Sequence, residues 1–225
     1  MMISKLADYI RPSMNNSGKR NAPVTRITPH VVVGEFDALT VASWFNNPDR
    51  KASANYIIGK NGEVVSNVDE DLRAWTSGSA YNDNRAITIE CSSDKNNHNA
   101  LNEKVYDKLV NLCVDICRRY GKTKAVYFPD RVTAEGYNLR DNEMLFTKHN
   151  FYQNVACPDT WLENKYPEFI SRVNAIIDGT IKPKSDDETK LYRVQVGAFK
   201  SKENAIKLCN ELKQKGYNDA FIKEV

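Results

Sequence analysis

A histidine and a cysteine in the second half of the chain are of the types that bind a soft metal ion. His149 and Cys157 stand eight positions apart, and Cys157 directly precedes Pro158, a residue suited to the first turn of a helix. An imidazole and a thiolate suit zinc better than they suit magnesium or calcium. Two ligands do not make a site, so the rest of the chain must supply a third ligand and a base.

Two predicted strands carry suitable candidates. His30 lies in residues 27–34, a β-branched run that predicts a buried strand, although Pro29 within it favours a strand end or an edge strand. Residues 86–91 alternate, so the isoleucines fall on one face of a predicted strand and Glu90 falls on the other. His30 is therefore the candidate third ligand, and Glu90 is the candidate base.

These residues together predict a reaction. His30, His149 and Cys157 match the three-ligand pattern of a catalytic zinc site whose fourth position is open to water. Zinc lowers the pKa of that water to about 7 and polarises a neighbouring carbonyl. Glu90, outside the coordination sphere, would take the proton and pass it to a leaving amine. The predicted chemistry is hydrolysis of an amide.

Simpler interpretations of the same residues stay open. A single histidine in an apolar run is more often a core residue than a ligand, and Glu90 could instead pair with Arg85. Cys157 and His149 could also serve as the nucleophile and base of a cysteine hydrolase.

The segments that must position these residues alternate between strands and helices. An Asn-Gly pair between two apolar runs predicts a β-hairpin of residues 53–58 and 63–66. Asp37 is the predicted N-cap of a following helix, and Pro167 is expected to break or kink a late one. Periodicity predicts the remaining elements, which are helices at 38–45, 101–120 and 158–177 and strands at 124–128 and 144–148. The interleaving predicts an α/β body with a mixed sheet.

Composition divides the chain into three parts. Residues 1–178 form the predicted body, which begins with a mostly irregular arm, residues 1–25, laid over it. Residues 179–190 are a linker by composition. Residues 191–225 predict a strand–helix–strand (βαβ) unit that is too small to bury a sizeable core alone. We therefore expect this unit to pack on the body or to pair with a second copy.

Charge and hydropathy exclude several classes of protein. Residues 181–225 hold 10 of the 32 Lys and Arg and 7 of the 29 Asp and Glu, which leaves 22 of each sign in the first 180. A neutral body lacks the cationic face that nucleic-acid binding needs. No window approaches the roughly 20 apolar residues that span a bilayer, and the start has no signal-peptide core. Five cysteines at spacings without a disulfide framework favour a reducing compartment, so we expect synthesis in a cytoplasm without membrane association.

Four segments carry a resemblance to a known family. Residues 26–30, 53–62, 84–90 and 149–158, in this order and spacing, resemble the N-acetylmuramoyl-L-alanine amidase type 2 family of zinc amidases, relatives of the peptidoglycan recognition proteins. The likeness is greatest to endolysins and autolysins of clostridia and their phages, and it covers about residues 20–178.

The resemblance implies a fold, a metal and a substrate. It implies a central mixed sheet flanked by helices, Zn²⁺ held by His30, His149 and Cys157, and peptidoglycan as substrate, cleaved between N-acetylmuramic acid and L-alanine. Glu90 matches the position of the catalytic acid/base; the tyrosine that other members use near the hairpin is replaced here by Ala54. The substrate-binding residues that it implies are Trp75, Asn55 and Tyr81, although Trp75 could instead cap the core.

The chain departs from the family pattern at three positions. Pro29 replaces the usual apolar residue before the first ligand, and Asp159 stands where the family has glycine after Cys-Pro. Val155 occupies the place of a lysine that stabilises the oxyanion in several relatives, so reduced activity is an open alternative.

The tail resembles the front half of a SPOR domain, a fold that binds glycan strands stripped of peptide. The matching segments are residues 192–199 and 205–212. Because only one βαβ unit is present, a homodimer partner could complete it.

The resemblance to phage lysins further implies synthesis in a bacterial cytoplasm, action on the cell wall after release, and a holin if the protein is phage-encoded. A peptidoglycan-recognition module that binds without cutting is the competing function, against which Cys157 and Glu90 argue.

Overall fold

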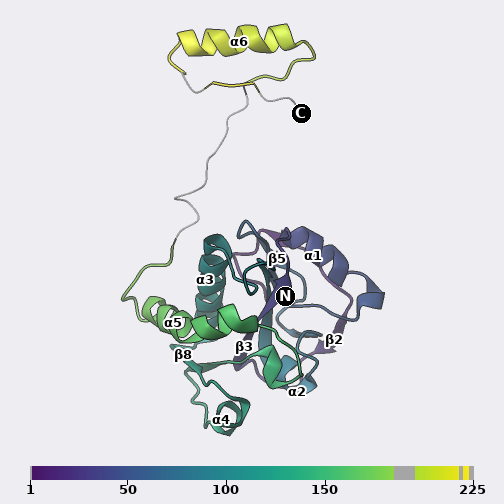
Figure 1. Ribbon diagram of the computed structural model, residues 1–225, viewed down its shortest axis with the longest axis vertical. Helices are drawn as coiled ribbons and strands as arrows, with labels where there is room; N and C mark the ends of the chain where they lie inside the picture. Colours follow the sequence, from purple (N-terminus) through teal and green to yellow (C-terminus); the bar gives the residue numbers. More distant parts are fainter. Residues whose placement is uncertain (1, 185–195, 218–219, 223–225) are drawn as a thin grey trace. The chain divides into compact units, whose positions relative to one another are not determined.

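A computed structural model describes residues 2–184, 196–217 and 220–222 of the chain. The chain divides into two compact units, Met1–Lys184 and Ser185–Val225, which are described separately below (Figure 1). The first unit contains every residue predicted to take part in catalysis or metal binding.

The first unit is built on a seven-stranded sheet with the strand order β1-β5-β4-β7-β3-β9-β8. Its strands are β1 (Tyr9–Ile10), β3 (Arg26–Val33), β4 (Tyr56–Ile58), β5 (Val64–Ser66), β7 (Ala86–Ser93), β8 (Lys124–Tyr127) and β9 (Glu143–Phe146). Only β4 and β5 pair antiparallel, and the other neighbours are parallel. The predicted hairpin and the mixed α/β sheet are therefore confirmed.

One face of this sheet is covered by two long helices, α3 (Glu103–Arg119) and α5 (Asp159–Ile177) (Figure 1). The apolar stripe of α3 packs on the isoleucines of β7, and both groups are fully buried in the main core. Cys113 and Cys117 belong to this stripe and are buried thiols, as expected of core residues. Burial of this face supplies the main driving force for folding the unit.

The opposite face is covered in part by α1 (Ala38–Phe45), which packs on Ala54, Ile57 and Val65. Asp37 does stand at the N-cap position, but its side chain makes no capping hydrogen bond. Glu63 Oε1, from the hairpin turn, accepts from the N–H of Ala38 at 2.8 Å instead. The predicted N-cap position of Asp37 is therefore confirmed, but a carboxylate from another segment makes the hydrogen bond to the helix end.

The N-terminal arm is more regular than predicted. It contributes β1 to the edge of the main sheet, and β2 (Asn16–Lys19) pairs with β6 (Leu72–Ala74) in a small antiparallel sheet. Strands β1 and β2 are short: Pro12 lies between them, and β2 contains Gly18. They form because partner strands supply hydrogen bonds, which local sequence patterns do not report.

Pro29 lies in a central strand, so its predicted place at an edge was wrong. β3 pairs with β7 along its whole length, and with β9 only at Arg26 and Ile27. The carbonyls of Thr25 and Ile27 accept bonds from the β9 side. Backbone groups of every second residue in a strand face the same neighbouring strand. The nitrogen of Pro29 therefore faces the β9 side, as the carbonyls of Thr25 and Ile27 do, but it lies past the last residue of β3 that pairs with β9. Its missing N–H therefore removes no ladder bond.

Pro167 does not break the last helix of the first unit. α5 is 19 residues long and continues on both sides of Pro167. Leu162 and Tyr166 before the proline and Phe169 after it are all fully buried. Burial on both sides offsets the roughly 3 kcal/mol that an interior proline costs a helix.

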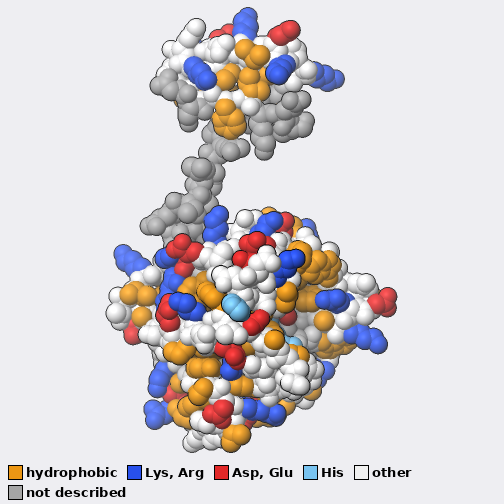
Figure 2. Space-filling view, in the orientation of Figure 1, with side chains coloured by type: hydrophobic (Ala, Val, Ile, Leu, Met, Phe, Trp, Pro, Cys, Tyr) orange, Lys and Arg blue, Asp and Glu red, His pale blue; other side chains and the backbone are white. Residues whose placement is uncertain are grey.

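The remaining short elements of the first unit lie in its connections. They are η1 (Pro48–Arg50), α2 (Ala80–Asp83), α4 (Arg131–Gly136) and η2 (His149–Phe151). On the face of this unit shown in Figure 2, basic and acidic side chains are interspersed, as the neutral charge of the body leads one to expect.

The second unit contains the predicted helix, α6 (Lys202–Gln214). The two strands predicted beside it, residues 191–199 and 220–225, fall in part on residues 191–195 and 223–225, which lie outside the described residues. The described residues 196–199 and 220–222 are not part of a strand. In the part of the chain that the structure describes, no helix is long and apolar enough to cross a membrane.

Candidate active site

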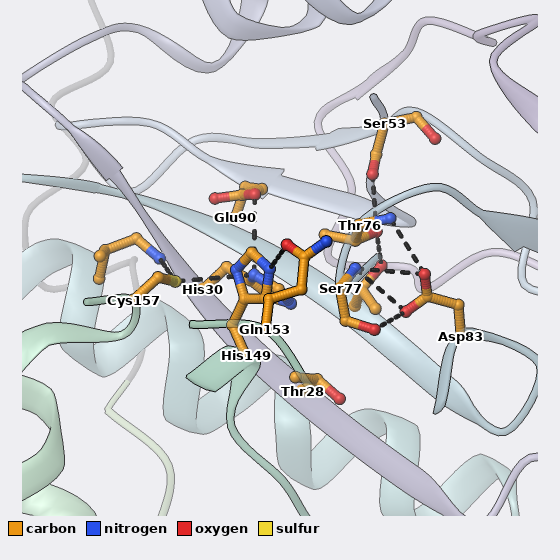
Figure 3. A network of polar contacts seen from close by, with 12 residues as sticks. Thr28, His30, Ser53, Thr76, Ser77, Asp83, Glu90, His149, Gln153 and Cys157 are labelled. Atoms are coloured by element: carbon orange, nitrogen blue, oxygen red, sulfur yellow. Dashed lines mark hydrogen bonds and ion pairs between the residues drawn. The ribbon is translucent and has the colours of Figure 1, made fainter. Parts of the chain in front are cut away.

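The structure brings the three predicted ligands together. His30 lies on β3, His149 begins η2 just after β9, and Cys157 lies just before α5. One ligand atom from each residue lies within 4.8 Å of the other two. His30 Nδ1 is 3.6 Å from Cys157 Sγ, and the two imidazole centroids are 4.6 Å apart. Residues far apart in the sequence thus form one cluster (Figure 3).

A backbone hydrogen bond closes the loop between His149 and Cys157. The N–H of Asn150, next to His149, donates to the carbonyl of Cys157 at 3.1 Å. The N–H of Val31, next to His30, donates to Cys157 Sγ at 3.4 Å. The thiol is therefore held over the strand that carries the first histidine.

Glu90 stands beside this cluster because of strand register. β3 and β7 pair parallel with His30 directly opposite Glu90, so the two side chains leave the same face of the sheet. Glu90 Oε1 lies 4.0 Å from His30 Nδ1, and its side chain is 14% exposed. Arg85 does not pair with Glu90: its Nη1 donates to the carbonyl of Tyr81. The alternative of a structural Arg85–Glu90 pair is not supported.

Burial sets the protonation of these groups. It lowers the pKa of His30 well below its usual value, with a further contribution from the other imidazole, and it lowers the pKa of His149. Burial raises the pKa of Glu90 to about 7. Both imidazoles are therefore neutral and able to bind a cation at neutral pH, while the Glu90 carboxyl can take up or release a proton there.

The cysteine is a poor nucleophile as it stands. Burial raises the pKa of the Cys157 thiol, and the charge of Glu90 raises it further. A catalytic cysteine needs a depressed pKa. The arrangement therefore disfavours a cysteine hydrolase, whereas a bound cation would favour the thiolate.

The donor set fits zinc. Two ligands of a tetrahedral zinc, each at about 2.0–2.3 Å from it, are about 3.3–3.8 Å apart. The 3.6 Å between His30 Nδ1 and Cys157 Sγ falls in this range, and the whole set closes within 4.8 Å. His30 Nε2 is also buried without a hydrogen-bond partner among the described residues. Two imidazoles and a thiol, with a carboxyl beside them, match the ligands of a catalytic zinc.

A groove of about 600 Å³ opens beside Glu90. Its lining is mostly apolar and aromatic and comprises Val31, Val32, Val33, Phe36, Val41, Trp44, Phe45, Arg50, Ala52, Ser53, Trp75, Thr76 and Glu90. Arg50 and Glu90 are the charged residues in it. Trp75, one of the predicted substrate-binding residues, lies in this wall and donates from Nε1 to Ser17 Oγ at 2.6 Å.

Asn55 does not face the groove. Its side chain is fully buried, and its Oδ1 accepts from the N–H of Thr88 at 3.0 Å and from Arg20 Nη2 at 3.1 Å. Its Nδ2 donates to the carbonyls of Val68 and Asp69. The structure therefore corrects the predicted substrate contact: Asn55 holds the backbone of neighbouring segments.

Tyr81 lies outside the groove lining as well. The residue is 49% exposed, and its ring contacts two guanidinium groups, those of Arg26 at 4.8 Å and Arg85 at 4.2 Å from the centroid. Its hydroxyl accepts from Arg26 Nη2 at 3.2 Å. Arg26 begins β3, whereas the groove lies at the other end of this strand. The position of Tyr81 thus gives its predicted substrate role no support.

Two polar residues near the ligands were not predicted from the sequence. Gln153 Oε1 lies 2.9 Å from His149 Nε2. Asp83 is buried and accepts from Ser77 Oγ at 2.5 Å and from the N–H groups of Thr76 and Ser77 at 3.2 Å (Figure 3). The spacing of four between His149 and Gln153 is the one sequence signal for either contact.

The departure at Asp159 has a backbone explanation. Asp159 has φ +65°, a region where glycine is at ease and aspartate is among the few other residues tolerated. Its carboxylate accepts from Asn99 Nδ2 at 2.6 Å and from the N–H of Thr160 at 2.5 Å. Val155, which the resemblance places where several relatives have a lysine, is 39% exposed.

Comparisons with known proteins agree on the family. The family model described as N-acetylmuramoyl-L-alanine amidase matches residues 20–160, and that of the SPOR domain matches residues 171–224. The chain belongs to the N-acetylmuramoyl-L-alanine amidase family.

Individual relatives add detail. A sporulation-specific N-acetylmuramoyl-L-alanine amidase of Bacillus subtilis is 31% identical over 104 residues, which cover 44% of this chain and 41% of that protein. The chain thus matches less than half the length of this curated relative.

Two solved structures share the fold. The hydrolase AmiA of Staphylococcus aureus, solved with its ligand, has a TM-score of 0.55 at 16% identity and covers 79% of this chain and 89% of its own. A mutant endolysin from Bacillus subtilis has a TM-score of 0.51 at 17% identity, covering 74% and 99% respectively. The predicted family and fold class are confirmed.

Proposed function

We propose that the protein is a zinc-dependent hydrolase that cleaves the amide bond between N-acetylmuramic acid and L-alanine in peptidoglycan. The observation that carries the proposal is the register of β3 and β7. It sets Glu90 opposite His30, within 4.0 Å, beside a cluster of two histidines and a cysteine. Membership of the amidase family supports the choice of bond.

His30, His149 and Cys157 would hold the metal. Zinc bound by them supplies a lowered pKa for water and polarisation of the scissile carbonyl. The loop bond from Asn150 to Cys157 and the bond from Val31 to Cys157 Sγ fix the thiol in place. Preorganised ligands of this kind avoid reorganisation during the reaction.

Glu90 would act as the general base and then as the general acid. It takes a proton from the attacking water and returns it to the nitrogen of the leaving L-alanine, so that one proton is passed and none is lost. Burial raises the pKa of this carboxyl to about 7 in the metal-free protein, and a bound cation would lower it toward the ionised form that a base requires. Its place in the groove lining brings it to the bound substrate.

The groove would receive the muramoyl peptide. Trp75 and Trp44 offer aromatic surface, which suits the apolar faces of a sugar or a peptide. Arg50 would face an anionic group of the stem peptide.

The tail would bind glycan strands, as the SPOR match suggests, and its pairing with a second copy stays a prediction. We further propose action on the cell wall after release from the cytoplasm, through a holin if the protein is phage-encoded.

Metal removal separates this proposal from a cysteine hydrolase. The assay uses a Cys209→Ser background, because Cys209 is half-buried whereas Cys91, Cys113 and Cys117 are buried. We expect a zinc chelator to abolish wall lysis and added zinc to restore it. An enzyme that is indifferent to the chelator, yet killed by thiol alkylation after zinc removal, would contradict the proposal.

The same protein distinguishes an enzyme from a recognition module. If it bound peptidoglycan and zinc but released no fragments, binding without cleavage would be its function. We expect soluble fragments to appear in proportion to the zinc-loaded fraction of the protein.

A further inference from the structure

We propose that Gln153 is a positioning residue for the metal ligand His149, and that Gly78 in the loop of residues 75–79 holds Gln153 in place. This inference rests on the zinc site of the proposed function. It adds a second layer of residues around that site and links one ligand to the wall of the groove.

The contact between Gln153 and His149 fixes the histidine tautomer. Gln153 Oε1 lies 2.9 Å from His149 Nε2. A carboxamide oxygen can only accept a hydrogen bond, so the imidazole proton lies on Nε2. Nδ1 then keeps its lone pair for a metal. Ligating histidines commonly donate their other N–H to an oxygen in this way, which sets the ring's orientation.

Gly78 supplies the space that Gln153 occupies. A Cβ at position 78 would lie 1.9 Å from Gln153 Nε2 and 2.4 Å from its Cδ. Gly78 also has φ +66°, which disfavours any side chain at this position. The carboxamide of Gln153 therefore packs directly against the backbone of the loop, and the position admits glycine alone without displacing it.

The loop itself is anchored to the sheet. Asp83 is 4% exposed and accepts from the N–H of Ser77 at 3.2 Å and from its hydroxyl at 2.5 Å. Thr76 Oγ1 lies 2.8 Å from Thr88 Oγ1 on β7, two residues before Glu90. The segment that supports Gln153 is thus tied to the strand that carries the candidate base (Figure 3).

The same loop begins with Trp75, which lines the groove. A displacement of this loop would therefore reach His149 through Gln153 as well as the groove wall. Loss of a partner of a metal-ligating histidine typically weakens metal binding by about 10–100-fold. We expect an effect of this size on zinc affinity when Gln153 is truncated.

The test measures the zinc dissociation constant of the full chain by competition with a chromophoric chelator. The variants are Gln153→Ala, Gln153→Glu, Gly78→Ala and the double variant Gly78→Ala/Gln153→Ala. Asn154→Ala, at the exposed neighbouring position, is the matched control.

We expect Gln153→Ala to weaken zinc binding by about 10–100-fold without changing the melting temperature of the zinc-free protein, because Gln153 is exposed. Gln153→Glu keeps an acceptor oxygen and should bind zinc at least as tightly as the wild type. Gly78→Ala should weaken zinc binding in the wild-type background but have no further effect once Gln153 is alanine. The control should bind zinc as the wild type does.

Unchanged zinc affinity in Gln153→Ala would overturn this inference but not the proposed function. The same holds if the double variant weakens zinc binding by the sum of the two single effects. A wild-type protein that binds no zinc would overturn the proposed function and this inference together.

Discussion

Replacing Glu90 by glutamine should affect turnover, zinc binding and stability in three different ways. Gln has nearly the same shape as Glu but cannot exchange a proton. General acid–base catalysis contributes about 10²–10⁴ in rate, so turnover should fall by about this factor. Zinc affinity should stay near that of the wild type, since Glu90 lies outside the set of three ligands.

The same substitution should raise the stability of the zinc-free protein, although it lowers turnover. Burial raises the pKa of Glu90 from 4.5 to about 7, so the charged carboxylate destabilises the folded state. The wild type loses stability as the pH rises from 4.5 through 7 and reaches its full penalty above that pKa. The shift corresponds to at most about 3.5 kcal/mol, at about 1.4 kcal/mol per pKa unit. The side chain is 14% exposed, so water screens part of this.

The Glu90→Gln variant lacks this penalty. It should match the wild type near pH 4.5 and exceed it in free energy of unfolding at pH 8 and above, which urea titrations of chelator-treated protein at both pH values would measure. Glu168→Gln, at a carboxylate that is 59% exposed, is the control and should show neither effect. Near-wild-type wall lysis by Glu90→Gln would show that the base is elsewhere. A stability difference that is the same at both pH values would refute the electrostatic argument.

Three further changes have expected outcomes. Arg119→Met should lower the free energy of unfolding by about 3–5 kcal/mol, because it leaves the fully buried Glu70 without its bidentate ion pair; a urea midpoint close to wild type would contradict this. Asp159→Ala should be less stable than Asp159→Gly by about 1 kcal/mol, since glycine accepts the φ of +65°, and equal melting temperatures would show that the backbone is not strained there. Deleting residues 181–225 should weaken binding to cell walls more than it slows cleavage of a soluble muropeptide, and unchanged sedimentation with walls would refute a wall-binding tail.

The ligands could be predicted from the sequence because their residue types are themselves the evidence. Two histidines and a cysteine in family order predict a zinc site without any knowledge of packing. Glu90 was predictable for a similar reason, since strand alternation alone separates it from the core isoleucines. What alternation does not give is register, and it is register that sets Glu90 opposite His30.

Other features depend on contacts that no local pattern reports. Asn55 falls within the run predicted as the first hairpin strand but directly precedes β4, and its hydrogen bonds to Thr88 and Arg20 lie in the interior. Pro29 is tolerated in a central strand because β9 stops pairing before reaching it. The contact of Gly78 with Gln153 joins segments 75 residues apart in the chain. Each of these follows from tertiary packing, which overrides local propensity.

Mass spectrometry of the fragments released from purified peptidoglycan tests the central claim most directly. We predict a new N-terminal alanine on intact stem peptides, with glycan strands left uncut. New reducing ends on the sugars, or stem peptides cut internally, would contradict it.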